Sequence, residues 1–163
     1  MKLFKGILAL SLLMMFTLVS CNKDDDDDSS SANMSATIDS DSWSSASRLS
    51  TMSDNLISVS GTSSTLDVVS VLIYGVEEGT YDFSLNATGS SIKCWCTYND
   101  VSLTGTTAYV STSGTVNLTE VDTVNKTVSG TFNFTVISTS LKIINIKGGV
   151  FNKLSYKVVS TEN

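Results

Sequence analysis

The chain carries few of the side chains that enzymes use for catalysis. It contains no histidine, which removes the most common general base and every serine–histidine or cysteine–histidine nucleophile pair. Paired carboxylates can hydrolyse a glycoside without histidine, and Glu77 and Glu78 are the obvious pair. Adjacent residues in a tight turn point apart, so we interpret these two as solvated turn acids. No catalytic residue is assigned, and the chain is not expected to be an enzyme.

Two short patterns contain metal-binding residue types, and both are incomplete. Asp39 and Asp41 alternate as at the start of a calcium loop, but the later ligands and the closing glutamate are missing at that spacing. A turn that leads into a packed Trp43 is the simpler interpretation. Cys94 and Cys96 lack a histidine or another free cysteine to complete a metal site. We therefore expect no metal and no cofactor.

Cys94 and Cys96 flank Trp95 in a segment with the alternation of a strand. Residues i and i+2 of a strand face the same side, so both thiols are expected to fill the core as small apolar groups. A disulfide is the alternative in an exported protein, although extended i, i+2 positions lie near the limit of bridging geometry. Trp95 then faces the other side. Its ring is a candidate ligand contact for a sugar or a partner protein, unless a loop or second layer covers it.

The N-terminal residues have the pattern of an export signal that ends in a lipid anchor. Lys2 and Lys5 precede a mostly apolar run, residues 7–19, which is short and early for a membrane span. The motif Leu-Val-Ser-Cys that ends at Cys21 resembles the bacterial lipoprotein box, in which diacylglycerol is joined to the thiol and the signal is removed. We expect residues 1–20 to be this signal. An ordinary signal peptide and an uncleaved anchor are the alternatives.

The residues after Cys21 predict a flexible tether and a localisation signal. Two or more acyl chains on Cys21 would hold a domain on a membrane stably. Lys23, Asp24 and Asp25 resemble the tag that sends lipoproteins of Bacteroidota to the outer face of the outer membrane, and the acidic run is also a solvated, self-repelling linker. We expect residues 21–33 to be the tether of an outer-membrane protein at the cell surface, with a periplasm-facing position as the alternative.

Residues 34–163 are about one domain in length, enough to bury a core. The chain has 10 basic and 16 acidic residues; removal of Lys2 and Lys5 leaves eight basic residues against the sixteen acids. Five of these acids lie in the tether, so the domain itself is mildly acidic. This balance excludes nucleic acid as a partner and is unsuited to lying flat on anionic lipid. Membrane contact is therefore expected through the N-terminal lipid.

Short alternating segments rich in Ser, Thr, Val and Ile, with no proline in the chain, predict an all-β domain. We expect an antiparallel β-sandwich or a partly closed β-barrel of about ten strands. Residues 66–74 are apolar on both faces and predict a central strand covered on both sides. Residues 127–137 alternate most regularly, so their register should be strongly set. The remaining expected strands are residues 34–38, 43–52, 56–61, 80–85, 92–98, 106–111, 115–121, 141–147 and 150–159, with Ser113 and Gly114 as a hairpin turn and Gly148 and Gly149 as a break.

One exposed turn contains a modification pattern. Asp122, Thr123 and Val124 match the acid, hydroxyl and aliphatic sequence that Bacteroidota glycosylate on the threonine oxygen. The pattern is short, but it lies in a predicted turn over residues 122–126, where such a modification has to be. Thr123 is therefore a candidate O-glycosylation site.

Several short motifs follow one another in a fixed order along the domain. They are Ala36-Thr37-Ile38-Asp39 followed by Trp43, Gly79-Thr80-Tyr81, Gly114-Thr115-Val116, the run from Val128 to Phe134, and Gly148-Gly149-Val150-Phe151. Together they resemble a family of uncharacterised small lipoproteins found mainly in Bacteroidota. The glycine that usually follows the first aspartate is Ser40 here, so that turn is expected to differ. The resemblance implies a β-rich fold and a surface-lipoprotein setting, and it brings no activity.

The favoured hypothesis is a surface-anchored, non-enzymatic β domain that binds a glycan, a protein or another ligand, or serves as an accessory subunit of an envelope assembly. The alternative is a lipocalin-like carrier of an apolar ligand in the envelope, which needs an internal cavity and would be excluded by a solid core filled by Phe132, Phe134, Phe83 and Tyr81. A hydrolase that uses carboxylates alone is the third hypothesis, and it needs two acids about 5–10 Å apart in one cleft.

Overall fold

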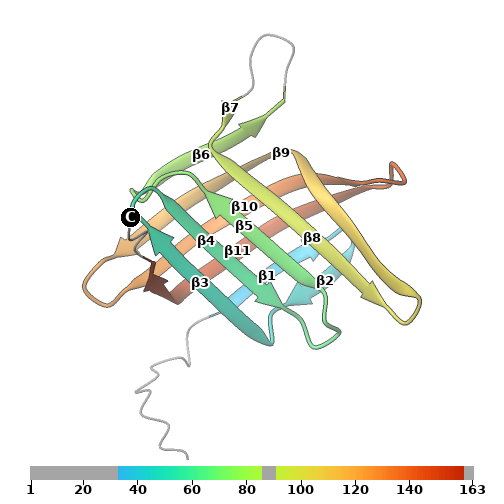
Figure 1. Ribbon diagram of the computed structural model, residues 1–163, viewed down its shortest axis with the longest axis horizontal. Coiled ribbons are helices and arrows are strands. Elements are labelled where there is room, and N and C mark those ends of the chain that lie inside the picture. Colours follow the sequence, from blue (N-terminus) through green and yellow to red (C-terminus); the bar gives the residue numbers. More distant parts are fainter. Residues whose placement is uncertain (1–32, 86–90, 160–163) are drawn as a thin grey trace, which may run out of the picture.

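The computed structural model describes residues 33–85 and 91–159, in which the chain forms eleven strands (Figure 1). None of the described residues form a helix that could cross a membrane. The expected export signal, Cys21 and the tag residues Lys23, Asp24 and Asp25 lie outside the described residues. The strands are β1 (Asn33–Ile38), β2 (Asp41–Ser44), β3 (Ser47–Ser53), β4 (Leu56–Thr62), β5 (Val68–Ile73), β6 (Gly79–Ser84), β7 (Ser91–Ile92), β8 (Cys94–Ser102), β9 (Gly105–Asp122), β10 (Thr127–Ser138) and β11 (Ile143–Val158).

All of these strands belong to one sheet that bends round on itself. Its order is β2-β1-β11-β3-β4-β5-β8-β9-β6-β7, and β10 pairs with both β9 and β11. The hydrogen-bonded path therefore returns on itself through β10, while β1–β2 and β6–β7 extend beyond the ring. The pairing of β11 with β3 is parallel over three residue pairs, and the other pairings described are antiparallel. The all-β prediction is confirmed, and the architecture is a partly closed barrel.

Two long strands make the ring possible. β9 has 18 residues and changes partner along one edge, pairing with β8 over residues 105–110 and with β6 over residues 113–118. β11 has 16 residues and likewise pairs first with β1 and then with β3. Register shifts against β10 mark bulges in both strands, and bulges bend a strand and increase its twist.

The predicted hairpin turn at Ser113 and Gly114 is wrong, because both residues lie inside β9. Gly114 pairs with Phe134 of β10 on one edge and with Phe83 of β6 on the other. A Cβ atom on Gly114 would collide with the ring of Phe134. Glycine is therefore present to make room for an aromatic ring, and the backbone does not reverse there.

Two other predicted boundaries also differ. β11 continues through Gly148 and Gly149, where Gly148 has a φ of 58° at a register shift and Gly149 lies under the ring of Phe132. A bulge therefore replaces the predicted break. By contrast, the single strand expected over residues 43–52 is two strands, β2 and β3. The break falls at Ser45 and Ala46, because β2 pairs with β1 whereas β3 pairs with β4.

The core lies between the two sides of the ring. In Figure 1, β3, β4, β5 and β8 cross over β10 and β11, and buried apolar side chains from both sides form one cluster. The alternation predicted for residues 127–137 is confirmed in β10, where Val128, Phe132, Phe134 and Val136 are buried. Phe132 stacks on Phe151 with 6.3 Å between ring centroids. In β5, one face is fully buried and the other is only half-buried, so the predicted two-sided cover is incomplete.

Candidate binding site

The two cysteines of β8 are buried, free core thiols, as expected. The Cys94 thiol donates a hydrogen bond to the Tyr81 carbonyl at 3.2 Å. Burial raises the pKa of Cys94 to about 11 and also raises the pKa of Cys96. Because the thiolate is the reactive form of cysteine, burial disfavours the reactive form of both thiols in the folded domain.

Trp95 lies on the opposite face of β8 from these thiols and is half-buried. Its ring meets Phe83 edge-on, with 5.2 Å between centroids and an interplanar angle of 88°. Trp95 is therefore partly covered, with its ring in contact with Phe83. It stands apart from the pocket described below, which it does not line.

The acidic residues singled out in the sequence have separate positions. Glu77 and Glu78 are exposed in the segment before β6, where the Glu77 carbonyl accepts a hydrogen bond from the Tyr81 hydroxyl at 2.8 Å. Asp39 has a φ of 53° and accepts a hydrogen bond from the Asn145 N–H at 2.9 Å. Asp39 therefore fastens the β1–β2 turn to β11. Within residues 33–85 and 91–159, no three acidic or cysteine side chains are grouped so as to hold a metal ion.

Thr123 is exposed at the tip of the β9–β10 turn. Asp122 organises this turn by accepting hydrogen bonds from the backbone N–H groups of Val124 at 2.9 Å and of Asn125 at 2.8 Å. The side-chain amide of Asn125 also donates to Asp122, and these bonds with Asn125 are the main reason that the pKa of Asp122 is lowered. The Thr123 hydroxyl is thus presented to solvent on an ordered turn.

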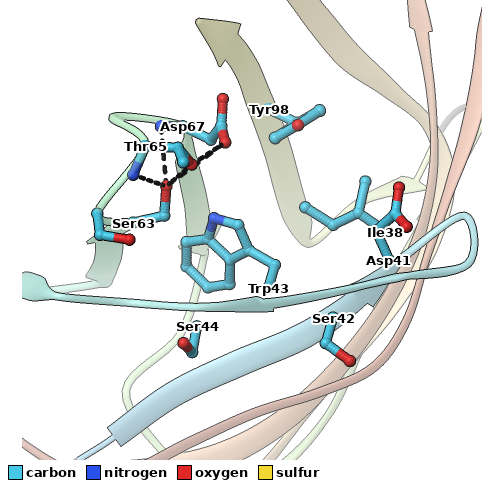
Figure 2. Close-up of a pocket in the computed structure, with 10 residues that line it drawn as sticks. Ile38, Asp41, Ser42, Trp43, Ser44, Ser63, Thr65, Asp67 and Tyr98 are labelled. Carbon is cyan, nitrogen blue, oxygen red and sulfur yellow. Dashed lines mark hydrogen bonds between the residues drawn. The ribbon is translucent and has the colours of Figure 1, made fainter.

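A surface pocket of about 310 Å³ brings together four separate parts of the chain (Figure 2). They are the end of β1, all of β2, the loop between β4 and β5, and the middle of β8. The side chains at its rim are exposed, whereas those of its floor are buried. We call it the Trp43 pocket, and its lining residues are Ile38, Asp41, Ser42, Trp43, Ser44, Ser63, Ser64, Thr65, Asp67 and Tyr98.

One wall of the Trp43 pocket is a chain of hydrogen bonds in the β4–β5 loop. A carboxylate only accepts, so the Thr65 hydroxyl donates to Asp67 Oδ2 at 2.6 Å. That leaves the Ser63 hydroxyl to donate to Thr65 Oγ1, 2.8 Å away. Ser63 Oγ also accepts from the backbone N–H groups of Thr65 and Asp67, and Asp67 Oδ1 accepts from the Val101 N–H of β8. The wall is therefore internally satisfied and tied to the sheet.

Trp43 forms the floor of the pocket and is only 6% exposed. Its indole packs so closely on Gly61 that a Cβ atom there would lie 2.8 Å from Trp43 Cη2. The indole N–H is buried and has no hydrogen-bond acceptor among the described residues. Figure 2 shows this nitrogen on the ring edge nearest to the Ser63–Thr65–Asp67 wall, whereas Ser42 and Ser44 lie on the other side of β2.

Tyr98 supplies a second polar group beside the floor. Its ring is buried and stacks on Tyr109 with 5.6 Å between centroids. Burial, followed by the negative charges of Asp67 and Asp100, raises the pKa of Tyr98 well above its ordinary value. The phenol therefore stays protonated, and no hydrogen bond of its hydroxyl group is found within the described part of the chain. The pocket thus holds two donors that lack acceptors.

Sequence reasoning placed Trp43 in the packed core but did not find the pocket around it. Its members are separated by up to 60 residues, from Ile38 to Tyr98. The nearest signal was the cluster of hydroxyl residues from Ser63 to Thr65, which resembles any polar loop. Only the pairing of β5 with β8 brings that loop beside Tyr98.

Fold and pocket together define an all-β domain, built as one partly closed sheet, with a polar and aromatic surface pocket. The chain belongs to the family described as a domain of unknown function (DUF6252), whose model matches residues 30–155. No curated protein and no solved structure matches the chain. The family resemblance inferred from the sequence is confirmed at this level, since the family is one without an assigned function.

Proposed function

We propose that this chain is an outer-membrane lipoprotein that displays a non-enzymatic binding domain at the cell surface. The observation that carries the proposal is the Trp43 pocket, which combines buried aromatic side chains with a few convergent polar groups, as ligand sites do. The residues before the domain support the location: the lipoprotein-box cysteine Cys21, the tag residues Lys23, Asp24 and Asp25, and the acidic run.

The acids of the pocket favour binding over catalysis. Glycoside hydrolysis needs two carboxyl groups that are free to act on one bond. Asp67 is engaged by the N–H of Val101 and the hydroxyl of Thr65, which leaves Asp41 without a free carboxyl partner among the residues of the pocket. We therefore assign the pocket to ligand recognition.

The packing of the interior favours a surface ligand over a cargo carried inside the barrel. Phe132, Phe134 and Phe151 are buried in the ring, and their centroids lie 6.3–6.4 Å apart in neighbouring pairs. Aromatic rings at this spacing are in contact, so they fill the space that an apolar cargo would need. An accessory role in an envelope assembly uses the same surface and is compatible with the proposal.

Protease digestion of intact cells tests the location. The wild-type chain is expected to be digested, and a variant with Lys23→Ala, Asp24→Ala and Asp25→Ala is expected to be protected, because the proposed tag is removed. A matched variant with Asp26→Ala, Asp27→Ala and Asp28→Ala keeps the tag and should be digested like the wild type.

Cys21→Ser tests the anchor in the same cells. Without the thiol no diacylglycerol can be attached, so the chain is expected to lose its acyl mass and to keep residues 1–20. A Cys21→Ser chain that keeps the acyl mass contradicts the anchor. Protection of the wild-type chain in intact cells contradicts the surface location and moves the search for ligands to the periplasm.

A further inference from the structure

We infer that the Trp43 pocket binds one neutral sugar residue through its hydroxyl groups. This inference rests on the proposed binding function and names the class of ligand. It is carried by the polar groups that remain unengaged around the pocket, by the charges of its lining and by its size.

Two donors in the pocket need acceptor atoms. The indole N–H of Trp43 is buried without an acceptor, and an unsatisfied buried donor is costly for a folded protein. The Tyr98 phenol lines the same pocket and is protonated because burial raises its pKa. The rings of Trp43 and Tyr98 are buried, and the indole N–H is closed to solvent, so a ligand oxygen reaches it by displacing the side chains above it. A ligand that places oxygen atoms against the floor satisfies both.

The rim provides acceptors. Asp41 is exposed, lines the pocket and makes no hydrogen bond from its side chain within the described residues. Thr65 Oγ1 donates to Asp67 and accepts from Ser63, which leaves it one free lone pair. A ligand must therefore accept hydrogen bonds at the floor and donate them at the rim. Hydroxyl groups do both, and a sugar residue carries several of them in a compact shape.

The charges of the lining exclude one class of ligand and disfavour another. The lining contains Asp41 and Asp67 and, among the described residues, no lysine or arginine. An anionic ligand would meet two carboxylates without a counter-charge. A simple ammonium group could pair with Asp41, but it has no lone pair to accept from Trp43 or Tyr98. A neutral polyhydroxyl ligand is the class that satisfies all four groups.

The size of the Trp43 pocket fits a single sugar residue at the end of a glycan. A volume of about 310 Å³ is at the small end of the range for small-molecule pockets, roughly 300–1,000 Å³. The floor is closed by Trp43 and the rim is exposed at Asp41 and Thr65. A terminal residue can therefore enter while the rest of the glycan stays in solvent.

The experiment uses the full-length chain purified in detergent and follows its two indole N–H signals by nuclear magnetic resonance. Trp43→Phe assigns the signals, because it removes one and leaves the signal of Trp95. The probes are neutral hexoses and their short oligosaccharides, with glucuronic acid as the anion and a simple primary amine as the cation. A neutral sugar is expected to shift the Trp43 signal in a saturable way and to leave the Trp95 signal in place.

Variants then locate the site. Tyr98→Phe and Asp41→Ala should each weaken the affinity for the neutral sugar about ten-fold or more, because each removes a hydrogen bond to the ligand. Asp54→Ala, which removes an exposed acid in the β3–β4 turn, is the matched control and should leave the affinity unchanged. A shift at Trp95 alone, or saturable shifts with only the anion or the amine, overturns the inference.

The failure of this inference can be told apart from the failure of the proposed function. If no neutral sugar shifts the Trp43 signal while the domain is digested on intact cells, the sugar inference is overturned and the surface-lipoprotein proposal stands. If sugars bind but the domain is protected in intact cells, the pocket assignment is supported and the location is overturned.

Discussion

The ring of Phe134 lies across the backbone of Gly114, its register partner in the neighbouring strand β9. The same glycine pairs with Phe83 on its other edge. An aromatic ring from β10 therefore occupies the space that a side chain at position 114 would fill. This contact joins the continuous strand β9 to the phenylalanine core at the point where sequence analysis predicted that the chain turns.

Gly114→Ala should destabilise the domain by roughly 1–3 kcal/mol, the usual cost of overpacking a well-packed core. Urea unfolding followed by fluorescence measures this free energy. Adding Phe134→Leu to Gly114→Ala should remove much of the collision. The free energy of unfolding of the double variant should therefore fall by less than the sum of the decreases in the two single variants. Thr107→Ala, at an exposed position of the same strand, is the control; equal losses for Gly114→Ala and Thr107→Ala would contradict the packing.

Gly61→Ala should disturb the floor of the Trp43 pocket. The added Cβ atom would lie 2.8 Å from Trp43 Cη2 and 2.9 Å from the Met34 sulfur, so the indole has to move. We expect a loss of about 1–3 kcal/mol in the free energy of unfolding and a displaced indole N–H signal for Trp43. The signal of Trp95 serves as the internal control, and an unmoved Trp43 signal would argue against the contact.

The stability of the domain should fall as the pH rises from 9 toward 11. An unfolded thiol has a pKa near 9, whereas burial raises the pKa of folded Cys94 to about 11. Between these values the folded state binds more protons than the unfolded state. The free energy of unfolding therefore decreases with pH, by up to about 1.4 kcal/mol per pH unit for each thiol. Urea unfolding between pH 7 and 10.5 measures this slope.

A variant with Cys94→Ala and Cys96→Ala separates the thiols from other groups that titrate in this range. It should be less stable at pH 7, because two buried sulfur atoms are removed, but its stability should depend less on pH above 9. An identical slope in the wild type and in the variant would assign the base sensitivity to other groups, with Tyr98 as the first candidate.

Thr123 should carry a glycan when the chain is made in a host that modifies the Asp-Thr-Val pattern. Its exposed position on the turn ordered by Asp122 makes the hydroxyl accessible to a transferase. Mass spectrometry of the intact chain is expected to show an added mass that Thr123→Val removes. Thr104→Val changes a threonine in the exposed β8–β9 turn without this pattern and should retain the mass. If the wild-type chain carries no added mass, the glycosylation prediction for Thr123 is wrong, and Asp122 only orders the turn.

Regular alternation made β10 predictable, because shifting its register by one residue would bring Phe132 and Phe134 into water. Glycine was less informative. At positions 114 and 149 it is required by rings from neighbouring strands, and nothing local distinguishes this from a turn. Likewise, the division between β2 and β3 follows from a change of partner strand. Such boundaries depend on pairing between distant segments, which a local pattern does not contain.

The Trp43 pocket was harder to predict from the sequence than the strand boundaries were. The sequence indicated a packed Trp43 after a turn, and the structure places it in the core. Whether its N–H finds an acceptor depends on the loop of Ser63 to Asp67 and on Tyr98, which reach it only through the order β4-β5-β8 in the sheet. A pocket lined by donors without acceptors is a property of the assembled fold.

β1 has mechanical consequences for a protein held at one end. It begins at Asn33, next to the proposed tether, and ends at Ile38, which lines the Trp43 pocket. Between these points it is paired with β11 on one side and with β2 on the other. If the chain is held by a lipid at Cys21 and binds a ligand in the Trp43 pocket, as we propose, a pull between the two would act along this strand, and its cross-strand hydrogen bonds would share the load. Under the proposed function, this arrangement would resist loss of the ligand under drag.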